Sequence, residues 1–133
     1  MAVVFCDSSV IVRYFVGDDP PRSLAAARLI DGDDELVIST SVLIETTHLL
    51  RRDHGVTNPD LAAGLMRLLS KANVRLIDAD QAATLAGLDW ARRVSARRIP
   101  DALIAAAAEH AGCDRIATFD ERFRSPTVPV RRL

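Results

Sequence analysis

Short apolar runs alternate along the chain with longer segments whose apolar residues recur every three or four positions. The runs AVVFC, LVIS, VRLID and RIATF are continuously apolar for most of their length, which is typical of strands buried in a parallel sheet. We therefore expect strands at residues 2–6, 36–39, 74–78 and 115–119, with a short edge strand at 128–132.

The intervals between these strands have helical periodicity and are bounded by proline, glycine and turn residues. The spacing predicts helices over residues 8–16, 22–30, 40–52, 61–72, 79–97 and 101–112. Strands that alternate with helices predict an α/β fold, here an α/β/α sandwich with a central parallel sheet covered on both faces. The length of 133 residues suits a single domain spanning 1–133.

Composition supports an ordinary globular protein, with 49% hydrophobic and 26% charged residues. No run approaches the roughly 20 apolar residues that cross a bilayer, so we expect a cytoplasmic protein without membrane contact. Cys6 and Cys113 lie far apart and lack closely spaced histidine partners, which predicts two reduced core thiols rather than a zinc site.

The formal net charge is −1, so the chain as a whole has no basic field that would attract nucleic acid. Its basic residues are nevertheless almost all arginine, which suits bidentate contacts with phosphate or carboxylate. The densest cluster is ARRVSARR, with Arg92, Arg93, Arg97 and Arg98. It is consistent with either a solvated helix face or a phosphate-binding rim.

Four acidic residues occupy positions where a ligand site could form. Asp7 and Asp120 follow expected strands, at the sheet edge where open α/β folds bind ligands. Asp101 opens a helix so rich in alanine that it must be largely buried. Glu45 lies in mid-helix at the border of an apolar stripe, where neither a cap nor a turn explains it. The three aspartates also have simple structural explanations as cap, first-turn or turn residues.

Together these acids would repel one another strongly if they converged. Two unit charges about 4 Å apart cost roughly 4 kcal/mol at an effective dielectric constant near 20. Such a cluster needs protons or a divalent cation, and oxygen ligands without histidine or cysteine favour Mg²⁺ or Mn²⁺. These ions bind phosphates and activate water for phosphodiester cleavage.

Four stretches occur in an order that is familiar from one family: VVFCDSSVIV, STSVLIETTHLL, PDALIAAAAEHAGC and RIATFDERF. Each is weakly specific alone, but the ordered set spans essentially the whole chain. The sequence resembles the PIN-domain family, and most closely the VapC-like toxin ribonucleases of VapBC-type toxin–antitoxin modules.

The resemblance implies a Mg²⁺- or Mn²⁺-dependent endoribonuclease that cleaves single-stranded or looped RNA, whether tRNA, rRNA or mRNA. Water activated by the metal would attack the phosphodiester and leave 5′-phosphate and 3′-hydroxyl ends. Motif positions map the catalytic and metal-binding acids of the family onto Asp7, Glu45, Asp101 and Asp120. Small hydroxyl residues that support these acids correspond to Ser9 and Thr118.

The resemblance also implies partners. A cognate VapB-like antitoxin would lay a peptide across the toxin, and the toxin would form a homodimer. The residues that we consider for contacts with the RNA backbone are Arg13, Arg92, Arg93, Arg97 and Arg98.

Other functions fit the sequence less well. A non-catalytic PIN-like RNA-binding or protein-interaction module would be marked by loss of acids, and all four are kept. A receiver-type phosphoacceptor domain would need a lysine after a late strand, whereas Lys71 precedes the third. A haloacid-dehalogenase-type phosphatase would need an aspartate where Ser9 stands. A metal-free mechanism would need paired histidines, and His48 and His54 do not share a helical face.

Overall fold

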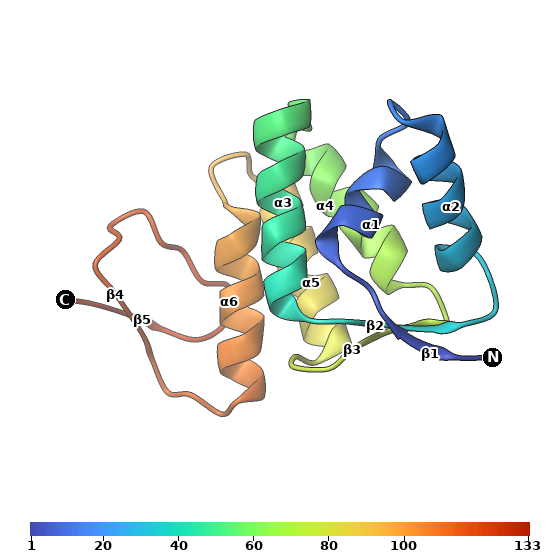
Figure 1. Cartoon of the computed structure of the whole chain (residues 1–133). Coiled ribbons are helices and arrows are strands. Elements are labelled where there is room, and N and C mark those ends of the chain that lie inside the picture. The colour runs from blue at the N-terminus through green and yellow to red at the C-terminus, as the bar shows by residue number, and fades with distance from the viewer.

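The structure, a computed structural model, describes residues 1–133 and contains six helices and five strands (Figure 1). The strands are β1 (Val3–Phe5), β2 (Glu35–Ile38), β3 (Val74–Leu76), β4 (Ile116–Thr118) and β5 (Val130–Arg132). The helices are α1 (Ser8–Phe15), α2 (Pro20–Ile30), α3 (Thr40–His54), α4 (Asn58–Leu69), α5 (Gln81–Arg93) and α6 (Ile99–His110). This alternation confirms the predicted α/β class.

Most helix boundaries agree with the sequence to within a turn, because capping residues fix them. The side chains of Ser39, Thr57 and Asp80 each accept a hydrogen bond from a backbone N–H in the first turn of α3, α4 and α5. The largest difference concerns the helix expected over 79–97, which ends at Arg93 because the backbone becomes extended at Val94.

The first three strands form one parallel sheet in the order β1-β2-β3. One face is buried beneath the helices and carries Leu36, Ile38, Val74 and Leu76. The opposite face is largely open, since Val3 is 64% and Phe5 55% exposed. The expectation that both faces of the sheet are covered therefore does not hold for β1.

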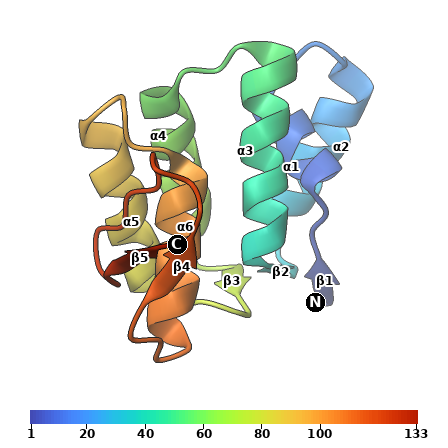
Figure 2. The same cartoon turned by 90° about the vertical axis from the view of Figure 1, so that its left-hand side faces the viewer.

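The last two strands form a separate parallel sheet, in which β4 pairs only with β5. Figures 1 and 2 show this pair beside α6, while β1 lies on the far side of α3. The structure thus differs from the single central sheet that the sequence predicts. Three-residue strands offer few ladder hydrogen bonds. The segment after β4 also contacts the start of α6, through Asp120 and the backbone of Arg124, as described below.

The core lies between the β1–β3 sheet and the helices and contains 22 buried residues. Each of the six helices contributes a large side chain that is at most 1% exposed. In the order α1 to α6 these are Ile11, Ile30, Leu43, Leu65, Leu88 and Leu103. Helices α5 and α6 approach closely at Gly87, where an added Cβ would lie 3.4 Å from the carbonyl oxygen of Ala102.

The two cysteines differ in their surroundings. Cys6 is buried in the core, as expected, but Cys113 is exposed, so the prediction of two core thiols was wrong for the second. Cys113 follows the turn that ends α6, where Gly112 has a φ of 75° and the chain leaves the core. None of the six helices combines the length and the apolar character that crossing a membrane requires.

Truncation of a core side chain should destabilise the protein in proportion to its burial. Leu43 is fully buried in the middle of α3, so we expect Leu43→Ala to lower the free energy of unfolding by about 2–5 kcal/mol. Leu24 of α2 is 52% exposed, so Leu24→Ala should change it by no more than about 0.5 kcal/mol. Urea denaturation measures the free energy of unfolding of both variants. Equal effects of the two substitutions would contradict the placement of Leu43 in the core and of Leu24 at the surface.

Candidate functional site

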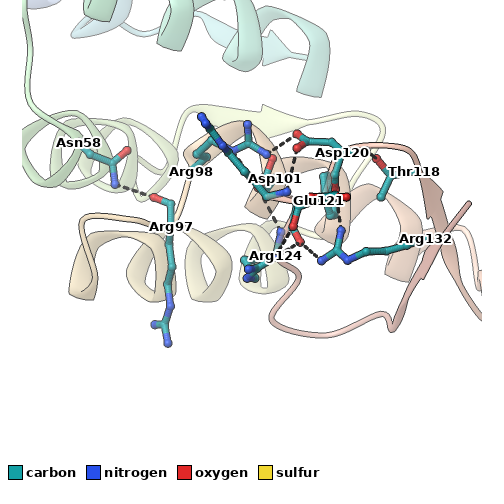
Figure 3. A network of polar contacts seen from close by, with 11 residues as sticks. Asn58, Arg97, Arg98, Asp101, Thr118, Asp120, Glu121, Arg124 and Arg132 are labelled. Atoms are coloured by element: carbon teal, nitrogen blue, oxygen red, sulfur yellow. Dashed lines mark hydrogen bonds and ion pairs between the residues drawn. The ribbon is translucent and has the colours of Figure 1, made fainter.

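One arginine joins two of the four predicted acids. The Arg98 guanidinium donates from Nε to Oδ2 of Asp101 at 3.2 Å and from Nη2 to Oδ2 of Asp120 at 2.6 Å (Figure 3). The three residues come from different parts of the fold: the loop before α6, its first turn and the end of β4. They form an ion triad that we call the Arg98 triad.

Asp101 is the buried member of the triad, only 5% exposed, because α6 packs into the core along its alanine-rich length. Pro100, immediately before it, suits the first turn of α6, because backbone N–H groups in the first turn of a helix have no partner within the helix and the N–H that proline lacks is not missed. The Oδ2 atom of Asp101 also accepts the backbone N–H of Arg124 at 3.2 Å. Its Oδ1 atom accepts no hydrogen bond from the protein and is not sealed from solvent.

Asp120 is the exposed member, and a local turn orients it. Its backbone N–H donates to the hydroxyl of Thr118 at 3.0 Å, and its Oδ1 accepts the backbone N–H of Arg122 at 2.9 Å. The hydrogen bond from Arg98, followed by that from Arg122, lowers the pKa of Asp120 below its ordinary value of 3.8. Asp120 is therefore ionised at neutral pH.

The loop that carries Arg98 is fixed from the other side. Asn58, at the start of α4, donates from Nδ2 to the backbone carbonyls of Ala91 at 3.1 Å and Arg97 at 3.0 Å (Figure 3). The Arg97 side chain donates to the carbonyl of Trp90 at 2.9 Å and lies 4.6 Å above the centre of its ring. These contacts restrain the backbone next to Arg98 independently of the contacts that the Arg98 side chain makes.

The other two predicted acids lie outside this triad. Asp7 is exposed at the start of α1, where its Oδ2 accepts the hydroxyl of Ser9 at 2.9 Å. This hydrogen bond lowers the pKa of Asp7 below its ordinary value of 3.8. Glu45 is exposed on α3 and makes neither an ion pair nor a side-chain hydrogen bond within the protein.

The acids therefore do not form the four-membered cluster that the sequence suggested. No three histidine, cysteine, aspartate or glutamate side chains converge in the structure. The reason is topological, because β4 is not the neighbour of β1, so Asp7 and Asp120 end strands of different sheets. The Arg98 charge in turn offsets part of the negative charge of Asp101 and Asp120, which both contact it.

A divalent cation fits the chemistry of Asp101 and Asp120. Both offer carboxylate oxygens, which Mg²⁺ prefers, and they already hold a cationic group between them in the Arg98 guanidinium. Mg²⁺ is commonly bound by only one or two carboxylates, with water and substrate phosphates as its other ligands. The pair thus has the composition of a magnesium site, whereas Asp7 and Glu45 do not contribute to it in this arrangement.

The five arginines considered for phosphate contacts all have partners in the structure. Arg13 pairs with Asp18 at 2.5 Å. Arg92 and Arg93 both pair with Asp89 at 2.7 Å. Arg97 and Arg98 make the contacts described above. The pairs of Arg13, Arg92 and Arg93 involve partly or fully exposed aspartates, so each is weak enough to exchange for a phosphate group, whereas Arg98 also pairs with the buried Asp101.

The sequence pointed to some of these contacts and missed others. Arg98 and Asp101 are three positions apart, a spacing at which side chains near a helix often meet, so the sequence itself could indicate this pair. The contact of Arg98 with Asp120 spans 22 positions, and no pattern indicates it. A third strand-end acid was also missed: Asp78 accepts the backbone N–H and the hydroxyl of Thr40, at 2.8 and 3.0 Å, and so caps α3.

Comparisons with known proteins give a family and several similar solved structures. The family model described as PIN domain matches residues 4–128. The structure of VapC20 from Mycobacterium tuberculosis, a Sarcin-Ricin loop cleaving toxin, is 22% identical in sequence and superposes with a TM-score of 0.44 over 92% of each chain. A comparison with curated proteins finds no match.

The two strand-end aspartates have separate partners, so their pKa values should respond separately. We expect Ser9→Ala to raise the pKa of Asp7 and leave that of Asp120 unchanged. Arg98→Gln should raise the pKa of Asp120 and leave that of Asp7 unchanged. Carboxyl-carbon NMR titrations of the wild type and both variants measure each midpoint, and a shift of both aspartates in either variant would contradict separate partners.

The same shifts determine how stability depends on pH. The folded-state pKa of Asp120 lies below 3.8, so its contribution to stability is present above pH 3.8 and is lost as the pH falls through the folded-state value. We expect thermal unfolding of Arg98→Gln to show a smaller loss of melting temperature than the wild type when the pH falls below 3.8. An equal acid sensitivity of the two proteins would count against the Arg98 triad.

Proposed function

The chain belongs to the PIN domain family, and from this membership we propose that it is a metal-dependent endoribonuclease, the toxin of a VapBC-type toxin–antitoxin module. Residues 1–133 would form one PIN domain. The observation that carries the proposal is the buried Asp101, which shares a cation with Asp120 at the start of α6. A charged carboxylate rarely lies in a core without a partner, and Asp101 shares the Arg98 guanidinium with a second carboxylate, that of Asp120.

Asp101 and Asp120 would hold the Mg²⁺ or Mn²⁺ ion, with Asp7 and Glu45 as further acids of the same site. When bound, the ion would supply an activated water and offset the negative charge that grows on the phosphate. The protein's own residues orient the carboxylates. The Arg124 backbone fixes Asp101, and Thr118 fixes Asp120, as Ser9 does for Asp7.

The substrate would be single-stranded or looped RNA, in tRNA, rRNA or mRNA. Phosphate contacts would come from the surface arginines Arg13, Arg92, Arg93 and Arg97, with Arg98 next to the acids. Because these contacts release counterions from RNA, affinity should fall steeply with salt. Aromatic residues make up only 5% of the chain, so base stacking would contribute little.

The partner would be a VapB-like antitoxin, and the toxin would form a homodimer. A cavity of about 590 Å³ between α1, α2 and α3 is suited to part of such a partner. Its walls are mainly apolar, and Arg13 and Arg22 stand at its rim. None of the four acids lines this cavity, so a partner seated there would leave the Arg98 triad uncovered unless its chain continued beyond it.

One observation favours a second candidate, a non-catalytic PIN-like module that binds RNA or protein. The Arg98 charge already offsets part of the negative charge of Asp101 and Asp120, and no third metal-binding side chain joins them. In that case the triad would be a structural ion pair. An assay of RNA cleavage separates the two candidates.

Replacement of the Asp101 carboxylate by an amide of the same shape should lower the cleavage rate far more than a control substitution does, and circular dichroism checks that the variant is folded. We expect partner-free wild type to cut pooled structured RNAs with Mn²⁺ or Mg²⁺ but not with EDTA, and Asp101→Asn to lower the rate by more than about a hundredfold. Asp60→Asn is the matched control, because Asp60 also follows a proline in the first turn of a helix but is exposed on α4. Its rate should equal that of the wild type.

The products test the nucleophile. Water attack predicts fragments with 5′-phosphate and 3′-hydroxyl ends. Digestion by a 5′-phosphate-dependent exonuclease, together with chemical analysis of the 3′ ends, distinguishes these fragments from ones that end in a cyclic phosphate. Cyclic phosphate ends would contradict water as the nucleophile. Equal cleavage by wild type and Asp101→Asn would contradict the site, and the absence of both cleavage and Mn²⁺ binding in the wild type would favour the non-catalytic module.

A further inference from the structure

We propose that Arg98 is an internal counter-cation that competes with the divalent cation for Asp101 and Asp120, so that metal binding requires its guanidinium to leave. The inference rests on the proposed function and concerns the same site. It assigns Arg98 a role that differs from that of the other arginines nearby. Its chemical basis is an exchange of one cation for another on the same pair of oxygens.

The contact atoms make the competition direct. Arg98 Nε and Nη2 lie 3.2 and 2.6 Å from the Oδ2 atoms of Asp101 and Asp120. A divalent cation held by Asp101 and Asp120 would draw on these carboxylate oxygens. Because the Arg98 guanidinium already occupies both Oδ2 atoms, the ion would have to compete with it for them.

Only Arg98 among the surrounding arginines occupies this position. Arg132 donates to the backbone carbonyls of Asp120 and Phe123. The Arg124 side chain likewise donates to backbone carbonyls, and Arg124 reaches Asp101 only through its backbone N–H (Figure 3). The carboxylates themselves are therefore paired with a single cationic side chain, which makes one substitution a clean test.

The way Arg98 is held suits an exchange. Its backbone is restrained, because the carbonyl of the preceding Arg97 accepts a hydrogen bond from the buried Asn58. Its side chain is 37% exposed and faces Asp120, which is 44% exposed, so the guanidinium can rotate into solvent without any movement of α6. Asp101 is only 7% exposed in its side chain and stays in position for the incoming ion.

The test is the affinity of the full-length protein for Mn²⁺, measured by isothermal titration calorimetry without RNA. We expect Arg98→Gln to bind Mn²⁺ about tenfold more tightly than the wild type, since a competing charge is removed and two carboxylates are left facing each other. Arg98→Lys keeps the charge but cannot bridge both acids in the same way, so its affinity should lie between the two.

The control is Arg75→Gln, which removes an equally charged arginine that pairs with Glu35 at 2.7 Å on the β1–β3 sheet. Its Mn²⁺ affinity should remain that of the wild type, within about twofold, because a distant exposed charge is screened. A gain in both Arg75→Gln and Arg98→Gln would show an effect of net charge alone and would overturn the proposal.

Thermal unfolding gives an independent readout. Without metal, Arg98→Gln should melt below the wild type, because Asp101 and Asp120 then repel each other. With saturating Mn²⁺ its melting temperature should rise by more than that of the wild type, since tighter binding to the folded state gives more stabilisation. A variant that Mn²⁺ does not stabilise more than the wild type would overturn the competition.

The outcomes separate this inference from the proposed function. Equal or weaker Mn²⁺ binding by Arg98→Gln, with metal binding by the wild type intact, overturns the role of Arg98 and leaves the nuclease proposal standing. No Mn²⁺ binding by either protein overturns both. If Arg98→Gln fails to fold, Arg98→Lys decides the matter, and an affinity no tighter than that of the wild type overturns the inference.

Discussion

The Arg98 triad is the interaction on which the architecture of the carboxyl-terminal third depends. The β4–β5 sheet pairs with no other strand, so backbone hydrogen bonds do not tie it to the β1–β3 sheet. The contacts of Arg98 with Asp120 and of Asp101 with the Arg124 backbone join the segment after β4 to the start of α6 instead. The side chains of the Arg98 triad thus connect two parts of the fold and also form the candidate site.

This double use limits what the site can do. A carboxylate as buried as Asp101 loses most of its hydration, and it is stable as a charge only while a cation or hydrogen-bond donors stay beside it. Withdrawal of Arg98 would leave the Arg124 backbone N–H as the remaining donor to Asp101, so a replacing cation would restore the charge pairing that is lost. A divalent cation meets this condition, whereas a neutral ligand does not, so the structural requirement and the proposed chemistry select the same kind of ligand.

The sequence predicted what depends on local pattern. Continuous apolar runs located four of the strands, the short edge strand at 128–132 was expected from VPVRR, and capping and periodicity located the six helices. The apolar composition of α6 also predicted that Asp101 would stand at the edge of the core, and it is buried. Contacts between distant segments were not predictable in this way. The separate β4–β5 sheet and the exposure of Val3 and Phe5 follow from which strands meet, and strand sequences of three residues carry too little information to choose a partner.

The positions of Asp7 and Glu45 decide how the proposed chemistry can be reconciled with this arrangement. Each has the local setting that the sequence suggested, at a strand end and in mid-helix, yet neither joins Asp101 and Asp120. A site made of four acids would need β4 and β5 to move toward β1. A site made of two acids needs no such movement, because Mg²⁺ is commonly held by one or two carboxylates and completes its shell with water and substrate phosphate. In the structure Asp101 and Asp120 already share one cation, Arg98, and in the second arrangement the RNA itself would be a source of the missing oxygen ligands. On this basis the exchange of Arg98 for a metal ion and the arrival of a phosphate would be successive steps at one pair of carboxylates.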